Sequence, residues 1–448
     1  MSIRFSRPRR AAIYFAMTVS ALVGATAWGA APKLVKATPD NGDQDVDPQQ
    51  VVEIRVVFDQ PMGKGASPVG GGDSFPEISG EPKWENDRTY VLPVKLVADH
   101  EYWLSINNQS FQNFRNLHGE AAVPYPIQFT TKAPQRTSEQ NRHAIAALRR
   151  AIDDDYSYRD RLKVDWDKQF MDYAAKLESA ASARRFCAVA AEMLAPAKDL
   201  HLWLQYKSSE IPTTRRRLDG NFNFKTLQKQ VPELKQLSAS VLSGRFDDGI
   251  AYIMIASWEK DDELAYKAAF DALRDAADAK AMVVDVRPNS GGDESLAREF
   301  AGCFINAPAA YAKDMTRQAG KTLGPYERVV EPSRDRTKYP GKVAILMGPA
   351  NMSSCESFLL MMKQVPCCRL VGAQSYGSSG NPKRHDLGDG IRAFIPSWND
   401  MLLDGTSIEG RGITPDEKVE ATASELVKND PILDRALTLL RDEIEKKR

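Results

Sequence analysis

Hydrophobic and polar residues alternate along the first part of the chain. In the stretch 52–58 every second side chain is apolar, which is the period of a half-buried strand. Further short strands are expected at 90–94, 102–106 and 125–131, and clusters of Gly, Pro, Asn and Asp separate them. Regularly spaced short strands with turn residues between them predict an all-β sandwich over residues 33–132.

The pattern changes after a short polar linker that follows residue 132. Apolar residues then recur at helical spacing in three stretches, 144–152, 170–177 and 186–194. Pro196 ends this block. We therefore expect a helical segment within residues 140–205, which forms the N-terminal part of the next domain.

From residue 249 onward, the pattern predicts buried strands that alternate with helices. The expected strands are 250–255, 281–286, 343–347 and 369–372, and the expected helices are 263–278, one from about 294, and 355–365. This alternation predicts a parallel sheet in an α/β domain over residues 206–440. In such sheets, ligand sites gather where strands end and helices begin.

Composition and charge argue against nucleic-acid partners, anionic membrane partners and a disulfide-rich fold. The 448 residues are 42% hydrophobic, with 60 basic and 60 acidic side chains. Because nucleic-acid and anionic membrane partners require a basic excess, neither is expected. The five cysteines are too few and too scattered for a disulfide framework or a metal site, so we expect mainly buried free thiols and no cofactor.

The first thirty residues have the layout of a secretory signal peptide. A basic start is followed by an apolar run over 11–24 and by small residues at 25–27. The alternative is an uncleaved anchor, but the run is short for a bilayer span. We expect a cleaved signal over 1–30, a periplasmic or extracellular protein, and no membrane span in the mature chain.

Ser353 stands on a predicted strand-to-helix turn. It follows the strand 343–347 and lies just before the helix 355–365. Free backbone N–H groups and the positive end of the helix dipole favour a developing oxyanion there. A serine in this place is more often a plain helix cap, so the segment by itself leaves both interpretations open.

A second turn supports the catalytic interpretation. Gly291 and Gly292 also follow a buried strand and precede a helix. Glycine allows a backbone to approach a ligand closely and to aim an N–H group at it. Beside the Ser353 turn, one of these glycines and Ser354 are expected to form an oxyanion hole.

A serine nucleophile needs a base, and the chain has five histidines. His100 and His118 fall in the predicted β domain and His143 in the first helix, while His385 lies in a predicted surface hairpin. His201 follows the helical block and is the best placed candidate.

Five motifs in register resemble the tail-specific, or C-terminal processing, serine peptidase family. They are 199–201 (Asp-Leu-His), 284–292 (Val-Asp-Val-Arg-Pro-Asn-Ser-Gly-Gly), 353–356 (Ser-Ser-Cys-Glu), 371–380 and 404–416. The resemblance implies a crotonase-like, Clp-protease-like α/β core and metal-free endopeptidase activity on protein or peptide substrates.

The same resemblance suggests which residues catalyse. In one branch of the family a lysine serves as the base, and Ser378 occupies its position here. Lys363 and Lys383 are nearby but are expected to be solvated. The tricorn-type branch uses serine, histidine and glutamate, which correspond to Ser353, His201 and Glu409. That branch has a serine directly before the histidine, where this chain has Leu200. Glu409 could therefore reach the imidazole directly or through water, or another group could orient it.

Two further features bear on function. A PDZ domain, common in the family, does not fit in the fifty or so residues between His201 and the strand at 250. The segments 39–42, 57–62, 102–104 and 129–131 resemble a bacterial Ig-like domain of the surface-layer type, which implies a spacer or contact module.

The sequence thus predicts an exported serine endopeptidase that forms an acyl-enzyme on Ser353, with His201 as base. The main rival is a catalytically retired peptidase core that acts as a binding or scaffold protein, motivated by Leu200 and the missing lysine. A lipid- or retinoid-binding relative is a third alternative. Substrate preference and oligomeric state are left open, and an oligomer is compatible with the sequence.

Overall fold

The computed structural model describes residues 30–161, 163–215, 220–259 and 263–446. The expected signal peptide lies outside these residues except for its last position. The described chain forms two compact units. The smaller runs to Arg136 and includes Ala181–Ala183, and the larger contains the rest from Thr137.

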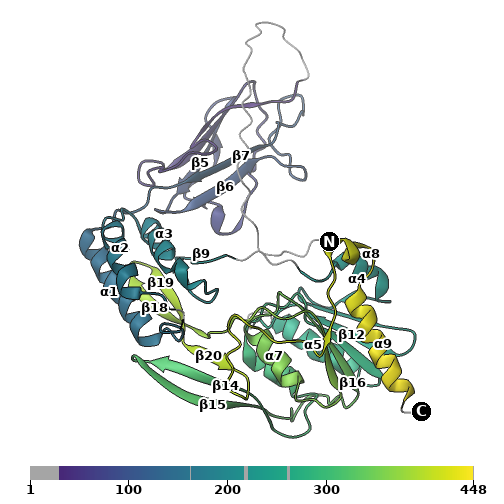
Figure 1. The fold of residues 1–448 in the computed structure, drawn as a ribbon. Coiled ribbons are helices and arrows are strands. Elements are labelled where there is room, and N and C mark those ends of the chain that lie inside the picture. Colours follow the sequence, from purple (N-terminus) through teal and green to yellow (C-terminus); the bar gives the residue numbers. More distant parts are fainter. Residues whose placement is uncertain (1–29, 162, 216–219, 260–262, 447–448) are drawn as a thin grey trace. The chain divides into compact units, whose positions relative to one another are not determined.

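The smaller unit is all-β (Figure 1). Its strands are β1 (Leu34–Thr38), β2 (Glu53–Phe58), β3 (Glu77–Ile78), β4 (Lys83–Trp84), β5 (Thr89–Lys95), β6 (Glu101–Ile106) and β7 (Tyr125–Thr130), with a short 3-10 turn η1 (Gly72–Ser74). One sheet has the order β1-β2-β5-β3, with β4 also paired to β5, and β6 pairs with β7 in a second sheet. The four strands expected from the alternation are confirmed.

The core of this unit lies between its two sheets. Side chains from both sheets, such as Ile54 and Leu104, are about 1% exposed and belong to one cluster. Phe114, which lies on a connection, packs edge-on against Tyr90 with ring centroids 5.2 Å apart. Every second residue of β2 is buried, as the alternation of apolar and polar residues in the sequence predicts. The Ig-like resemblance stays a prediction.

The larger unit begins with the three expected helices. They are α1 (Ser138–Asp155), α2 (Trp166–Glu178) and α3 (Ala183–Leu194), and η2 (Ala195–Ala197) follows as a 3-10 turn. Thr137 and Gln140 form a capping box that starts α1. Pro196 lies in η2, so the regular helix ends two residues before it.

A seven-stranded sheet with the order β10-β11-β12-β13-β16-β17-β21 forms the centre of this unit. Its strands are β10 (Lys235–Gln236), β11 (Val241–Arg245), β12 (Ile250–Ile255), β13 (Ala281–Asp285), β16 (Lys342–Met347), β17 (Cys368–Gly372) and β21 (Glu417–Lys418). The strands from β12 to β21 are parallel. The predicted parallel sheet is confirmed.

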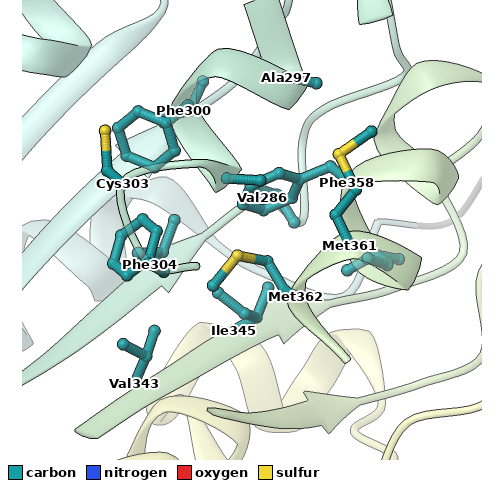
Figure 2. Packing of buried hydrophobic residues seen from close by; sticks show 14 of the residues in the cluster. Val286, Ala297, Phe300, Cys303, Phe304, Val343, Ile345, Phe358, Met361 and Met362 are labelled. Carbon is teal, nitrogen blue, oxygen red and sulfur yellow. The ribbon is translucent and has the colours of Figure 1, made fainter. Parts of the chain in front are cut away.

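Helices cover both faces of this sheet (Figure 1). One face is covered by α5 (Glu263–Asp275), α6 (Glu294–Ala301) and α7 (Ser354–Met362), and the other by α4 (Phe224–Gln230) and α9 (Pro431–Glu445), with α8 (Ala423–Lys428) beside α4. Figure 2 shows the first face, where Phe300 of α6 and Phe358 of α7 pack over Val286 and Ile345. This packing fixes the N-termini of α6 and α7 near one edge of the sheet.

Two small sheets complete the larger unit. Their strands are β8 (Trp203–Tyr206), β9 (Ser209–Pro212), β14 (Ala309–Gln318), β15 (Lys321–Val330), β18 (Pro382–Gly388), β19 (Ile391–Pro396) and β20 (Trp398–Met401). Their orders are β18-β19-β8-β9 and β15-β14-β20. The sequence pattern did not predict most of them, because strands such as β15 are largely exposed and lack a buried alternation.

A buried ion pair ties the sheet to the C-terminal helix. Arg287, just after β13, is 0% exposed and binds Asp285 at 2.7 Å and Asp430 at 2.8 Å. Asp430 is the N-cap of α9. The guanidinium thus joins the end of β13 to the start of α9.

All five cysteines are free thiols, as expected. Within the described segments, no helix combines the length and apolar character that crossing a bilayer requires. No group of three or more potential metal ligands gathers among these residues either.

Candidate functional site

Ser353 lies at the turn between β16 and α7, as its N-cap residue. Its backbone has φ 55° and ψ −135°, a conformation that non-glycine residues rarely adopt and that costs about 1–3 kcal/mol. Its side chain makes no capping hydrogen bond to α7. The plain helix-cap interpretation therefore fails, and what remains is a strained serine whose hydroxyl makes none of the described hydrogen bonds.

The two turns singled out from the sequence meet at this point. A Cβ added to Gly291 would lie 2.8 Å from the Ser353 Cβ, and Gly291 has φ 113°. Asn351 joins the turns, since its amide donates to the carbonyls of Val286 at 2.5 Å and Asn289 at 3.0 Å. Only a glycine fits at position 291, because any side chain would displace the Ser353 turn.

Of the four backbone N–H groups of Gly291, Gly292, Ser353 and Ser354, two have a described acceptor and two do not. The Gly291 N–H donates to Asn289 Oδ1 at 2.8 Å, and the Ser353 N–H donates to the Ser378 carbonyl at 2.8 Å. Among the described hydrogen bonds, none uses the N–H of Gly292 or that of Ser354. Of the two glycines proposed from sequence, Gly292 has the available donor, and Ser354 begins α7.

His201 is buried, with 6% of its surface exposed, in the loop that precedes β8. Asp199 holds this loop, because its Oδ1 accepts the His201 backbone N–H at 2.8 Å and its Oδ2 accepts the Tyr156 hydroxyl at 3.0 Å. Burial lowers the pKa of His201 to about 4 and raises the pKa of Asp199 to about 6. The imidazole is therefore neutral at ordinary pH, as a proton acceptor must be.

The Gly-rich segment 377–380 connects His201 to Ser353. The Ser378 hydroxyl lies 2.9 Å from His201 Nδ1, and the Ser378 carbonyl accepts the Ser353 N–H. A Cβ on Gly380 would lie 3.1 Å from the His201 Cβ. Within the described residues, no hydrogen bond joins the Ser353 hydroxyl to His201 directly. Such contacts are often long before substrate binds.

Glu356 anchors the same segment from the first turn of α7. Its carboxylate accepts the N–H groups of Gly377 at 2.7 Å and Ser378 at 2.9 Å, and the Ser375 hydroxyl at 2.5 Å. Burial raises the pKa of Glu356 to about 7. Because Glu356 is three residues from Ser353, the helix that carries the serine also holds the segment that contacts the histidine.

Glu409 lies on the other side of this segment. Its Oε2 accepts the Ser379 N–H at 2.8 Å, and burial, with the nearby Asp199 charge, raises its pKa well above the usual range. Among the described contacts, the partner of His201 Nδ1 is Ser378 and not Glu409. Glu409 is thus close to the site but supports the backbone beside the imidazole.

The alternative bases from the sequence lie in ion pairs. The Lys383 Nζ is 3.3 Å from Asp155 and the Lys363 Nζ is 3.3 Å from Asp416. His385 lies on β18 and also faces Asp155. Neither these side chains nor His201 is among the residues that line the cleft beside Ser353, and His201 differs from them by its contact with Ser378.

A cleft of about 490 Å³ opens beside Ser353. Its walls come from the start of α6, the first turn of α7, the segment 379–382 and β20. The lining residues are mostly polar: Glu259, Gly292, Asp293, Glu294, Ser295, Arg298, Ser353, Ser354, Ser357, Ser379, Gly380, Asn381, Pro382, Trp398 and Asp400. Gly292 and Ser354, whose N–H groups make none of the described hydrogen bonds, both belong to this lining.

Sequence reasoning did not assign roles to Ser378, Glu356 or Asn351. Each contacts a residue far away in the chain, and no spacing or period signals such a contact. The available signal was that Ser378 and Glu356 fall within two of the five family-like motifs, and that Asn351 lies two residues before the motif of Ser353.

Residues 249–419 match the sequence profile of "Peptidase family S41". A curated relative, named "Probable CtpA-like serine protease", comes from Staphylococcus saprophyticus subsp. saprophyticus. It is 26% identical over 144 residues, which cover 32% of this chain and 28% of that protein. The match thus spans little more than a quarter of the curated relative.

Solved structures share the fold over a longer stretch. A "putative peptidase" from Parabacteroides merdae ATCC 43184 has a TM-score of 0.58 at 23% identity, covering 67% of this chain and 96% of that one. The structure of mature CPAF complexed with lactacystin has a TM-score of 0.52 at 10% identity, covering 69% and 99%. At these identities the likeness concerns the fold.

Proposed function

We propose that this chain, whose residues 249–419 match the profile of the S41 peptidase family, hydrolyses peptide bonds through an acyl-enzyme formed on Ser353. The observation that carries the proposal is the meeting of two turns. One holds Ser353 in a strained conformation, and the other brings Gly292 with an available N–H group. A nucleophile beside two free N–H donors is the arrangement that acyl transfer requires.

The mechanism follows from these positions. Ser353 attacks the substrate carbonyl while His201 accepts its proton. The N–H groups of Ser354 and Gly292 bind the oxyanion, and Gly291 contributes by its close approach to the Ser353 turn. His201 then protonates the leaving amine, and a water molecule hydrolyses the acyl-enzyme. No metal or cofactor takes part.

Glu409 completes the proposed catalytic set. Its buried carboxylate binds the Ser379 N–H and so supports the segment that contacts His201. We propose that it acts on the imidazole through this segment, a route that differs from the direct and water-mediated contacts considered from the sequence.

The substrate is proposed to be a protein or peptide, and the location periplasmic or extracellular. The signal-like residues 1–30 motivate the location. The β unit, by its resemblance to Ig-like domains, would serve as a spacer or contact module.

A fluorophosphonate probe tests the activity, because it reacts covalently with an activated serine. We expect labelling of the folded wild-type chain and none of Ser353→Ala. As a control, Ser424→Ala removes an exposed hydroxyl on α8 and should label like wild type.

Labelling that is absent from the wild type, or equal in Ser353→Ala, would contradict the proposal. Absence would favour the rival function, a retired core that binds partners. Peptide mapping of the labelled protein should find the adduct on Ser353.

A further inference from the structure

Among the described hydrogen bonds, those of Ser378 reach both members of the proposed nucleophile–base pair. Its hydroxyl lies 2.9 Å from His201 Nδ1, and its carbonyl accepts the Ser353 N–H at 2.8 Å. It is 0% exposed. Its position relative to both residues is therefore fixed by protein contacts and not by solvent.

The Ser378 backbone is itself held on α7. Its N–H donates to Glu356 Oε2 at 2.9 Å, and the preceding Gly377 N–H donates to Oε1 of the same carboxylate. Glu356 and Ser353 lie one turn apart at the start of α7, and the Glu356 N–H donates to the Ser353 carbonyl at 2.8 Å. These hydrogen bonds link the Ser353 carbonyl to Glu356, and Glu356 to Ser378, whose hydroxyl lies beside His201.

The imidazole needs such a partner. A histidine acts as a base through one ring nitrogen only if the other carries the proton, and the hydrogen bond made by the other nitrogen decides this. Among the described hydrogen bonds, neither Asp199 nor Glu409 bonds to the His201 ring. Asp199 binds the His201 backbone and the Tyr156 hydroxyl, and Glu409 binds the Ser379 N–H.

We infer that Ser378 is the positioning residue for His201: its hydroxyl oxygen accepts the Nδ1–H and leaves Nε2 unprotonated to act as the base. This inference rests on the proposed peptidase function and adds the group that sets the working tautomer. A hydroxyl is neutral, so it orients the ring without the charge that a carboxylate would supply to the imidazolium.

The primary test reads the tautomer directly. In protein with ¹⁵N-labelled histidine, long-range proton–nitrogen correlation spectra distinguish an Nδ1–H ring from an Nε2–H ring. His201→Gln identifies the His201 signals among those of the five histidines. We expect the Nδ1–H form in wild type. In Ser378→Ala we expect a shift to the Nε2–H form or to a mixture, and Ser378→Thr, which keeps the hydroxyl, should restore the Nδ1–H form.

The second readout is the rate at which the fluorophosphonate labels Ser353. We expect Ser378→Ala to slow it on the order of tenfold to a hundredfold, because a correctly protonated base contributes at least that much. Ser397→Ala is the matched control, since this serine is also buried, at 3% exposed, and its hydroxyl donates to the Asn381 carbonyl. The control should keep both the wild-type rate and the wild-type tautomer. Thermal unfolding checks that each variant is folded.

The outcomes separate the two proposals. An Nε2–H ring in wild type, an unchanged tautomer in Ser378→Ala, or an unchanged labelling rate in that variant overturns the role of Ser378 and leaves the peptidase proposal standing. A wild-type protein that does not label, but shows the Nδ1–H ring and its loss in Ser378→Ala, overturns the peptidase proposal and leaves the contact with His201 standing.

Discussion

Ser353 and His201 owe their proposed roles partly to local sequence and partly to contacts with distant segments. The sequence indicated that Ser353 lies between a strand and a helix, because buried apolar residues flank it on both sides. The backbone strain at Ser353 and the burial of His201 come from contacts with distant segments. The proposed proton transfer from Ser353 to His201 depends on this burial, because burial lowers the pKa of the imidazole and keeps it neutral.

The pH dependence of the reaction should reflect this burial. Burial disfavours the imidazolium and lowers the pKa of His201 to about 4. The neutral base forms as the pH rises through that value. The rate of probe labelling should therefore rise between about pH 3 and 5 and stay level through about 6.5, the ordinary histidine value.

A pH series of labelling rates checks this, with circular dichroism at each pH to confirm folding. His385→Gln is the control and should leave the profile unchanged, because His385 lies on β18 and faces Asp155 instead of the segment that contacts Ser353. An acid limb centred near 6.5 in the wild type would show that the imidazole is solvated when it reacts.

At the scale of elements, the parallel strands and their helices bring the two turns together. β13 and β16 are neighbours in the sheet, so the turns that follow them lie side by side. The sequence predicted both strands and both helices, and hence that the two turns lie close together. It did not predict the small sheets, whose exposed strands lack a regular buried face. One of these, the sheet containing β18 and β19, follows directly on the segment that contacts His201.

Arg287 stabilises this arrangement of elements. We expect Arg287→Met to lower the free energy of unfolding by about 3–5 kcal/mol, because Asp285 and Asp430 would remain buried without their cation. Urea denaturation measures the change. Arg435→Met removes a pair with Glu417 whose side chains are 42% and 36% exposed, and it should cost less than about 1 kcal/mol. Equal losses in the two variants would contradict a structural role for the buried cluster.

At the scale of the molecule, the chain consists of an all-β unit and a larger unit that contains every proposed catalytic residue. The match to the peptidase family, residues 249–419, lies wholly in the larger unit. His201 and the helices α1 to α3 precede that match, so the family profile alone does not include the proposed base.

We expect the two units to fold separately. A fragment that begins at Thr137 should label with the fluorophosphonate at a rate within about threefold of the full chain, because the nucleophile, base and oxyanion donors all lie within it. A fragment of residues 30–136 should unfold cooperatively by itself. The Ser353→Ala form of the larger fragment is the control. A larger fragment that folds, as judged by circular dichroism, but does not label would assign the β unit a direct part in the reaction.

The sequence by itself determined the classes of the main elements, the position of Ser353 and the Gly291–Gly292 turn, because apolar period and turn residues are local properties. Only the tertiary structure decided which N–H groups stay free and which side chain contacts His201. Asn289 engages the Gly291 N–H, and Ser378 reaches His201 across 177 positions of the chain. Such contacts are set by the packing of whole elements against one another, and no local pattern encodes them.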